Sequence, residues 1–286
     1  MRRPFGKSHR RSRLPSRPRR TPALLAALIT AATLATGAAH AAPENPRSAP
    51  MLDPHDPNGA WAGYSLPGSR SGAPPQQPAG ALSGMDVSGH QGDVDWPAAW
   101  AAGARFAYVK ATEGSGFRSG SFNQQYDGSH AVGMVRGAYH FGLPDRSSGA
   151  QQANFFVDNG GGWNDGGRTL PGALDIETNP YGDPCYGLDP RAMSDWIADF
   201  SNTYLNRTGR FPVIYTTTRW WNGCTGSNPD FAANNPLWIA RYAPQIGDLP
   251  AGWDFQSIWQ HSDQGPLPGG QDSFNGNSKQ LRRFAS

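Results

Sequence analysis

The hydrophobic pattern of the chain changes near Ser83. From there on, short apolar runs alternate with longer segments, several of which have the spacing of an amphipathic helix. That alternation is typical of a parallel α/β architecture. The apolar runs predict strands at residues 84–88, 105–112, 135–141, 172–177, 211–217, 236–243 and 255–262. The segments between them predict helices at residues 95–103, 121–133, 147–160 and 189–209.

The segment 189–209 is the clearest helix. Asp189 is suited to cap it, and Pro190 to occupy its first turn. Apolar residues then recur at helical spacing, at Met193, Trp196, Ile197, Phe200 and Tyr204. After the fifth predicted strand the connections look irregular rather than helical. We therefore expect an imperfect barrel related to the (β/α)8 fold, with fewer helices in its second half.

Barrels of this kind carry their active sites at the C-terminal ends of the strands. The residues predicted to lie there are rich in carboxylates and aromatic rings: Asp86, Glu113, Tyr139, His140, Asp175, Glu177, Tyr215, Arg241, Tyr242, Trp259, Gln260 and His261. We expect these side chains to converge on one rim of the barrel.

Two of these carboxylates are separated by a single residue in "LDIE". Side chains alternate along a strand, so Asp175 and Glu177 are predicted to point the same way while Ile176 points the other. Their α-carbons would lie roughly 6.6 Å apart. Two carboxyls that close and shielded from water cannot both ionise freely, so we expect one pKa to rise and provide a general acid. The alternative is that they cap a loop or pair with an arginine.

The aromatic residues fit a sugar substrate, because aromatic faces pack on pyranose rings while carboxylates bind hydroxyls. Tyr139, Tyr215 and Trp259 are the aromatic site candidates. Trp96, Trp100 and Trp196 fall inside helical segments and are predicted to belong to the core.

The sequence gives little support for other kinds of active site. The chain has no H-E-x-x-H, no C-x-x-C, no G-x-S-x-G and no phosphate-binding loop. His140 and His261 at strand ends are the nearest approach to a metal site, and we expect neither a metal nor a cofactor. Cys185 and Cys224 predict one disulfide in an exported protein, with a thiol nucleophile as the alternative.

Residues 1–41 have the features of a secretory signal peptide. A basic leader precedes an apolar run from Ala23 to about Ala35, and Ala39-His40-Ala41 resembles a cleavage site. The apolar run is too short for a membrane span. Arg19-Arg20 leaves the twin-arginine route open beside the general secretory route. We expect a secreted or wall-associated protein with no membrane anchor after cleavage.

Removing this leader reverses the net charge. The chain has 25 basic and 22 acidic residues, and nine of the basic ones lie in the leader, which leaves 16 against 22, a formal charge of −6. The basic composition is therefore no evidence for nucleic-acid binding. Residues 42–82 are rich in Pro, Gly, Ser and Ala and read as a linker, or alternatively as a strap that docks Trp61 and Tyr64. Residues 83–286 form the one predicted folded domain.

Several motifs together resemble a known family. "MDVSGHQGDVDW", "FAYVKATEG", "GAYHF", "LDIE", "VIYTT", "LWIARY" and "IWQ" followed by "FNG" occur in the order and spacing of the Chalaropsis-type lysozymes, glycoside hydrolase family 25. The resemblance covers about residues 84–286. It implies a flattened β/α barrel, with about five strands backed by three helices plus extra C-terminal strands. It also implies hydrolysis of the β-1,4 bond between N-acetylmuramic acid and N-acetylglucosamine in peptidoglycan.

The resemblance also implies roles for individual residues. Glu177 would be the general acid, Asp175 its partner that holds the substrate acetamido group, and Asp86 a further catalytic carboxylate. Tyr139 and Tyr215 would line the sugar subsite, and Cys185 and Cys224 match a disulfide of the family. Trp259, Glu113 and Arg241 complete the substrate-binding candidates.

The sequence departs from the family pattern at two places. Gly89-His90 replace a His-Trp pair, which weakens one aromatic wall of the cleft. Gly270 replaces an acid, so either Asp272 stands in as the fourth catalytic carboxylate or the site works with three. The rival interpretations are a chitinase or other β-N-acetylglucosaminidase, and a binding module that has lost activity. We expect a monomer whose partner is the glycan strand.

Overall fold

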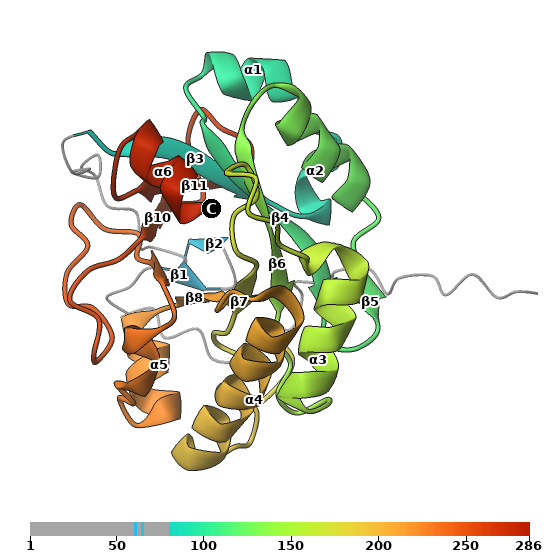
Figure 1. Ribbon diagram of the computed structural model, residues 1–286. Coiled ribbons are helices and arrows are strands. Elements are labelled where there is room, and N and C mark those ends of the chain that lie inside the picture. Colours follow the sequence, from blue (N-terminus) through green and yellow to red (C-terminus); the bar gives the residue numbers. More distant parts are fainter. Residues whose placement is uncertain (1–59, 62–63, 66–79) are drawn as a thin grey trace, which may run out of the picture. The chain divides into compact units, whose positions relative to one another are not determined.

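The computed structural model describes residues 60–61, 64–65 and 80–286 (Figure 1). The chain divides into two units, residues 1–40 and 41–286, and every described residue belongs to the second. The predicted signal peptide 1–41 and most of the predicted linker 42–82 lie outside the described residues. Two short strands of the linker, β1 (Ala60–Trp61) and β2 (Tyr64–Ser65), pair antiparallel with each other.

The folded region is built around a closed barrel. Pairing of β3 with β4 closes eight strands of a nine-stranded sheet, and the short β5 (Phe117–Arg118) extends it beyond β4. The barrel strands are β3 (Leu82–Val87), β4 (Phe106–Glu113), β6 (Val135–Phe141), β7 (Ala173–Asp175), β8 (Val213–Thr216), β9 (Leu237–Ala240), β10 (Ile258–Ser262) and β11 (Gly270–Phe274). All pair parallel except β11, which runs antiparallel between β10 and β3.

Helices surround this barrel, and α6 lies across one of its ends (Figure 1). They are α1 (Trp96–Ala101), α2 (Phe122–Ala131), α3 (Gly149–Phe156), α4 (Pro190–Thr208), α5 (Thr218–Thr225) and α6 (Ser278–Phe284). The Asp189 side chain accepts hydrogen bonds from the first turn of α4, and Gly209 ends that helix at φ 79°. Single turns occur at η1 (Gly89–Gln91), η2 (Val157–Gly161) and η3 (Asp230–Ala233).

Strand side chains alternate between the barrel interior and the helical layer. The inward apolar cluster contains Phe106, Tyr108, Ala173, Val213, Tyr215, Trp238, Ala240, Tyr242 and Ile258. The outward residues Leu174, Ile176, Ile214, Leu237, Ile239 and Trp259 pack with the apolar faces of α3, α4 and α5. Each strand therefore presents every second residue to the interior, which decides which polar residues can meet there.

The predicted fold class is confirmed. The strands β3, β4, β6, β7 and β8 form the regular part, and β9, β10 and β11 are the additional C-terminal strands. Two features differ from expectation. β11 lies in a Gly-, Pro- and Gln-rich segment whose sequence does not predict a strand. The strand forms because this segment pairs with both β10 and β3. The connection after β8 was expected to be irregular. This is wrong, because the connection contains the helix α5, whose apolar pattern spans only two turns.

Candidate active site

Asp175 and Glu177 enter the barrel from the end of β7. Leu174, which precedes Asp175, and Ile176, which lies between the two acids, pack in the outer core. The alternation predicted from "LDIE" is therefore observed. The backbone N–H of Ile176 donates to the Tyr215 carbonyl at 3.0 Å, which continues the strand pairing beyond Asp175. Both acids are buried, with Asp175 7% and Glu177 2% exposed. The structure thus places two carboxyls close together with little water.

Burial raises the pKa of Asp175 well above its usual range, and the Glu177 charge raises it further. The nearby Lys110 ammonium opposes this rise. Two carboxyls that interact so strongly titrate as a pair, so the retained proton belongs to both. The Oδ1 atom of Asp175 is buried without a hydrogen-bond partner in the described part of the chain. It is therefore an acceptor that a bound substrate can satisfy.

Asp86 at the end of β3 is held by an amide. Its Oδ2 accepts a hydrogen bond of 2.7 Å from Nε2 of Gln260. The Oε1 of the same amide accepts from the hydroxyls of Tyr215 at 2.8 Å and Tyr242 at 2.9 Å. The amide oxygen thus accepts from both hydroxyls while the amide N–H is directed toward Asp86. Burial raises the pKa of Asp86 to about 6, and the Gln260 hydrogen bond limits the rise.

Asp272 on β11 lies deeper in the barrel than Asp86. It is paired with Gly84, two residues before Asp86, and is only 1% exposed. Trp238 Nε1 donates to its Oδ1 at 2.8 Å, while its Oδ2 is buried without a hydrogen-bond partner in the described residues. Burial and the Asp86 charge raise the pKa of Asp272 well above its usual range. Asp272 thus lies below Asp86 and keeps a proton to higher pH than an isolated carboxyl, rather than standing at the rim.

Gly270, which replaces a family carboxylate, is opposite Asp86 in the β3–β11 pair. A Cβ added at Gly270 would overlap the Asp86 carboxylate and lie 2.7 Å from Gln260 Nε2. The missing side chain therefore leaves the space in which the Asp86–Gln260 hydrogen bond forms.

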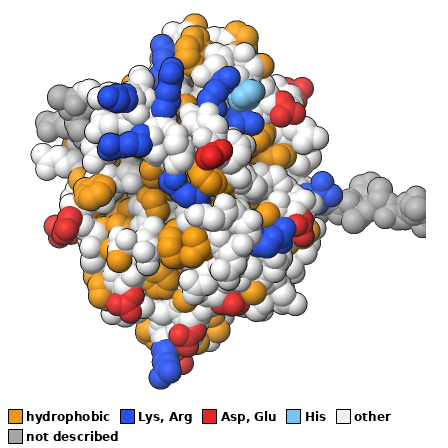
Figure 2. All heavy atoms as spheres, viewed as in Figure 1, with side chains coloured by type: hydrophobic (Ala, Val, Ile, Leu, Met, Phe, Trp, Pro, Cys, Tyr) orange, Lys and Arg blue, Asp and Glu red, His pale blue; other side chains and the backbone are white. Residues whose placement is uncertain are grey.

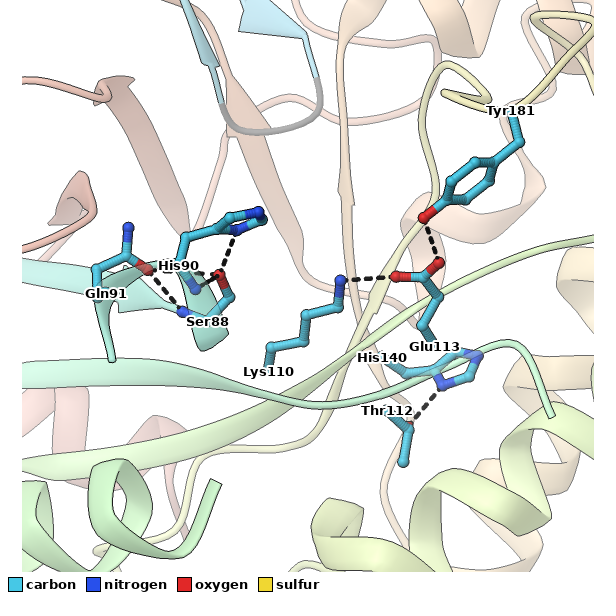
Figure 3. Close-up of polar contacts among 8 residues, drawn as sticks. All are labelled: Ser88, His90, Gln91, Lys110, Thr112, Glu113, His140 and Tyr181. Atoms are coloured by element: carbon cyan, nitrogen blue, oxygen red, sulfur yellow. Dashed lines mark hydrogen bonds and ion pairs between the residues drawn. The ribbon is translucent and has the colours of Figure 1, made fainter. Parts of the chain in front are cut away.

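A second charged group lies at the end of β4 (Figure 3). Lys110 Nζ contacts Glu113 Oε2 at 2.7 Å, and the Tyr181 hydroxyl donates to Glu113 Oε1 at 2.6 Å. Lys110 is on the inward face, in register with Tyr139 of β6. The structure thus brings Glu113 to the rim as expected, and adds Lys110 and Tyr181, which the sequence analysis did not select.

Some of the aromatic and cationic candidates face the barrel interior, and others face away from it. Tyr139 and Tyr215 face inward and contact the Trp238 ring edge-on, with centroids 6.4 and 4.8 Å apart. Trp259 faces the outer core, is 1% exposed, and donates from Nε1 to the Arg241 carbonyl. The Arg241 side chain donates to the Gln245 carbonyl within its own loop. The structure therefore does not bring Trp259 or Arg241 to the carboxylates.

His140 also faces away from the site, stacked on Phe200 in the outer core. Its Nε2 lies 2.9 Å from the side-chain oxygen Oε1 of Gln152, an acceptor, so Nε2 carries the proton and Nδ1 accepts from the Thr112 hydroxyl at 2.7 Å. Burial lowers the pKa of His140 to about 4, so it is neutral near pH 7. In the described residues, no three His, Cys, Asp or Glu side chains are grouped as metal ligands.

The predicted disulfide between Cys185 and Cys224 is present, which leaves no thiol nucleophile in the described chain. It ties the loop that follows Glu177 to α5, and Trp220 Nε1 donates to the Pro184 carbonyl beside it. The disulfide therefore anchors the loop that carries Tyr181. None of the described helices has the length and apolar character needed to cross a membrane.

Comparison with known proteins identifies this arrangement. The model of the family "Glycosyl hydrolases family 25" matches residues 85–270. The chain belongs to family 25. It is a glycoside hydrolase by that membership, and the family named from the sequence motifs is confirmed.

The relatives agree with the family assignment. An N,O-diacetylmuramidase of Arthroderma benhamiae is 46% identical over 72% of this chain and 88% of its own length. Lysozyme M1 of Streptomyces globisporus is 44% identical over 72% of this chain and 71% of its own length. A solved muramidase structure from Acremonium alcalophilum is 53% identical, with a TM-score of 0.71, and covers 71% of this chain and 98% of that one.

The other departure from the family 25 pattern, Gly89-His90, forms the turn η1 after β3. His90 is exposed, and its Nδ1 lies 2.9 Å from Ser88 Oγ (Figure 3). The Ser88 backbone N–H donates to Gln91 Oε1 at 2.8 Å, which closes the turn. The aromatic wall expected here is thus replaced by an imidazole on a tight turn.

Proposed function

We propose that this family 25 chain is a lysozyme, an N-acetylmuramidase that hydrolyses the β-1,4 bond between N-acetylmuramic acid and N-acetylglucosamine in peptidoglycan. The observation that carries the proposal is the buried pair of Asp175 and Glu177 inside the mouth of a family 25 barrel. The relatives named muramidase or lysozyme support the substrate. No observation favours a chitinase, and the intact carboxyl groups speak against a module without activity.

The Asp175–Glu177 pair supplies the acid. Because burial and the Glu177 charge raise the pKa of Asp175, the pair holds a proton to higher pH than an isolated carboxyl, and Glu177 passes it to the glycosidic oxygen as the bond from that oxygen to the anomeric carbon breaks. Asp175 Oδ1, which has no partner in the described chain, accepts the N–H of the substrate 2-acetamido group. This orients the acetamido oxygen to form a bond with the anomeric carbon from the opposite face.

Water then completes the reaction. Glu177, now ionised, takes a proton from a water molecule whose oxygen bonds to the anomeric carbon as the acetamido oxygen leaves. Two inversions give net retention. Asp86 and its Gln260 amide stand across the mouth and stabilise positive charge on the sugar ring, while Tyr139 and Tyr215 line the subsite.

The setting of the enzyme is also part of the proposal. Residues 1–41 act as an export signal, residues 42–82 as a linker and residues 83–286 as the catalytic domain. The mature enzyme is secreted and monomeric, and acts on glycan strands without nucleic acid or membrane as a partner.

The retaining route is tested by the anomer released first from a soluble peptidoglycan oligomer, read by NMR during the first turnovers. The proposal expects the β anomer, which then mutarotates. Initial α anomer would show inversion and remove the acetamido group as nucleophile.

A further inference from the structure

The opposite end of the barrel, where the parallel strands begin, carries a basic surface. Arg105 precedes β4, Arg136 lies at the start of β6, and Arg210 precedes β8. The helix α6, which follows the antiparallel β11, covers this same end. We call the following residues the basic face: Arg105, Arg136, Arg168, Arg210, Lys279, Arg282 and Arg283.

Backbone contacts join these residues into one surface. The Arg136 backbone N–H donates to the Arg168 carbonyl at 3.1 Å, and the Val135 N–H donates to the Arg105 carbonyl at 3.1 Å. Gly167, the neighbour of Arg168, lies close to α6, because a Cβ placed on it would be 3.8 Å from the backbone oxygen of Arg282. Figure 2 shows Lys and Arg side chains gathered over the region where Figure 1 places α6.

The half-buried arginines of the basic face are held in place by aromatic rings and backbone oxygens. The guanidinium of Arg105 lies 4.2 Å from the Trp100 ring centroid, that of Arg136 4.3 Å from Tyr126, and that of Arg210 4.8 Å from Trp163. Arg105 also donates to the Trp100 carbonyl, and Arg210 donates to the backbone oxygens of Phe284, at 3.2 Å, and Ser286. The contacts of Arg105 and Arg136 order these two cations without neutralising them.

No acidic side chain in the described residues forms an ion pair with the basic face. Three exposed arginines elsewhere do have such partners: Arg146 contacts Asp145, Arg191 contacts Asp195, and Arg207 contacts Asp158. The chain beyond residue 41 has 16 basic and 22 acidic residues, so composition alone predicts a negative surface. The basic face is a local concentration of unpaired positive charge in an acidic protein.

A cavity of about 310 Å³ opens on this face between α6 and the segment before β10. Arg210 and Arg283 line it together with Phe255 and Phe284. Phe255 is 65% exposed, which is unusual for a phenylalanine. An aromatic ring beside two guanidiniums suits a polyol or sugar unit that carries an anion, because arginine binds phosphate oxygens through paired N–H groups.

We propose that the basic face is a second, non-catalytic binding surface for a linear polyanion with a phosphodiester in each repeating unit. Such polymers are interleaved with peptidoglycan in many bacterial walls, so the choice of a wall polymer rests on the proposed function. The affinity itself depends only on the charges and the cavity. Because the carboxyl pair lies at the other end of the barrel, the bound polymer leaves the cleft free and retains the enzyme in the wall.

The test measures binding of the full chain carrying Glu177→Gln, so that the wall is not consumed. The probes are purified walls that carry poly(glycerol phosphate), and the same walls after hydrofluoric acid has removed it. The test variant adds K279Q, R282Q and R283Q, three exposed residues of α6. The matched control adds R146Q, R191Q and R207Q, which removes the same charge elsewhere.

The proposal expects the α6 variant to bind phosphate-bearing walls at least tenfold more weakly than its parent, and the control to bind within about twofold. Soluble poly(glycerol phosphate) should compete, and higher salt should weaken binding. Thermal unfolding verifies the fold, and the double change K279Q and R282Q serves if the triple variant unfolds. Walls bound equally before and after phosphate removal, or an unaffected α6 variant, would overturn the proposal.

Two further outcomes are informative. Duplex DNA that binds as tightly as poly(glycerol phosphate) would also overturn the proposal, because the face would then recognise charge alone. Failure of the muramidase proposal is seen separately, in the sugar found at the new chain ends, and leaves this binding result unchanged.

Discussion

At the end of the barrel where the parallel strands finish, Asp175 and Asp272 are buried and Asp86 is half-buried, and all three carboxyls hold protons at unusually high pH. At the end where those strands begin, the arginines of the basic face are ordered and fully charged. Both ends are polar, but burial acts differently on them. A buried carboxyl can neutralise itself by taking up a proton, and this makes it a proton donor. An arginine cannot, so it keeps its charge and remains a binding group. One end is therefore suited to chemistry and the other to adhesion.

The largest effect is expected from the acid pair itself. Glu177→Gln removes the proton donor and should lower turnover on peptidoglycan by about 10³-fold, within the usual range for a general acid. Asp175→Asn, which loses the acetamido acceptor, should lower it by about 10²-fold. Asp195→Asn, an exposed change on α4, is the control. Wild-type turnover in the Glu177→Gln variant would remove the catalytic role of this end.

A smaller effect is expected where Gln260 holds Asp86. Asp86 has a pKa of about 6 and must be ionised to stabilise positive charge, so activity should fall as the pH drops below about 6. Gln260→Glu replaces the N–H donor by a second acid, which raises the pKa of Asp86 and moves this acidic limb to higher pH. Turnover at neutral pH should fall about tenfold.

The pH–rate profile of Gln260→Glu is the measurement, with the exposed Gln264→Glu as its control. An acidic limb that stays in place while turnover falls would indicate a purely structural role for Gln260.

Much of this end could be predicted from the sequence. The motif "LDIE" predicts that Asp175 and Glu177 face the barrel interior, because the alternate residues Leu174 and Ile176 are apolar and pack against the helices. The same alternation in β10 and β9 directs Gln260 and Tyr242 into the barrel, rather than their neighbours Trp259 and Arg241. The presence of Ile258 and Trp238 at the alternate positions was the signal that could have found them.

Other features were not accessible from local sequence. Strand β11 is defined by its pairing with β10 and β3, and without it neither the depth of Asp272 nor the space left by Gly270 can be known. The basic face is assembled from loops far apart in the sequence. The negative charge of the mature chain gave no indication of it.

A still smaller effect, on stability rather than rate, is expected for Asp272→Asn. The folded state keeps a proton on Asp272 that the unfolded chain releases above pH 4, so this residue costs stability increasingly as the pH rises from there toward its folded pKa. Asparagine cannot ionise, so this dependence of stability on pH is lost, and its amide oxygen can still accept from Trp238. We expect a higher Tm at pH 7, and a Tm that changes less between pH 5 and 7.

Turnover of Asp272→Asn should stay within about threefold of wild type, because the side chain does not reach the substrate. Calorimetry at several pH values and a wall-digestion assay measure both quantities, with Asp195→Asn again as the exposed comparison. A loss of activity as large as that of Asp175→Asn would place Asp272 in the catalytic machinery instead.

The smallest effect is expected for Arg241→Gln. Its guanidinium orders the loop at Gln245 and points away from the acid pair, so KM and turnover should change by less than about twofold. Steady-state kinetics on soluble peptidoglycan fragments checks this. A selective rise in KM would show that the loop turns Arg241 toward the substrate.

The most direct test of the difference between the two ends is the identity of the sugar at the new reducing ends. Defined peptidoglycan is digested with the enzyme, reduced with borohydride and analysed by mass spectrometry. Cleavage by the Asp175–Glu177 pair as proposed leaves reduced N-acetylmuramic acid at the new ends, and none with Glu177→Gln. Reduced N-acetylglucosamine at those ends, or unchanged cleavage by the variant, would contradict the account.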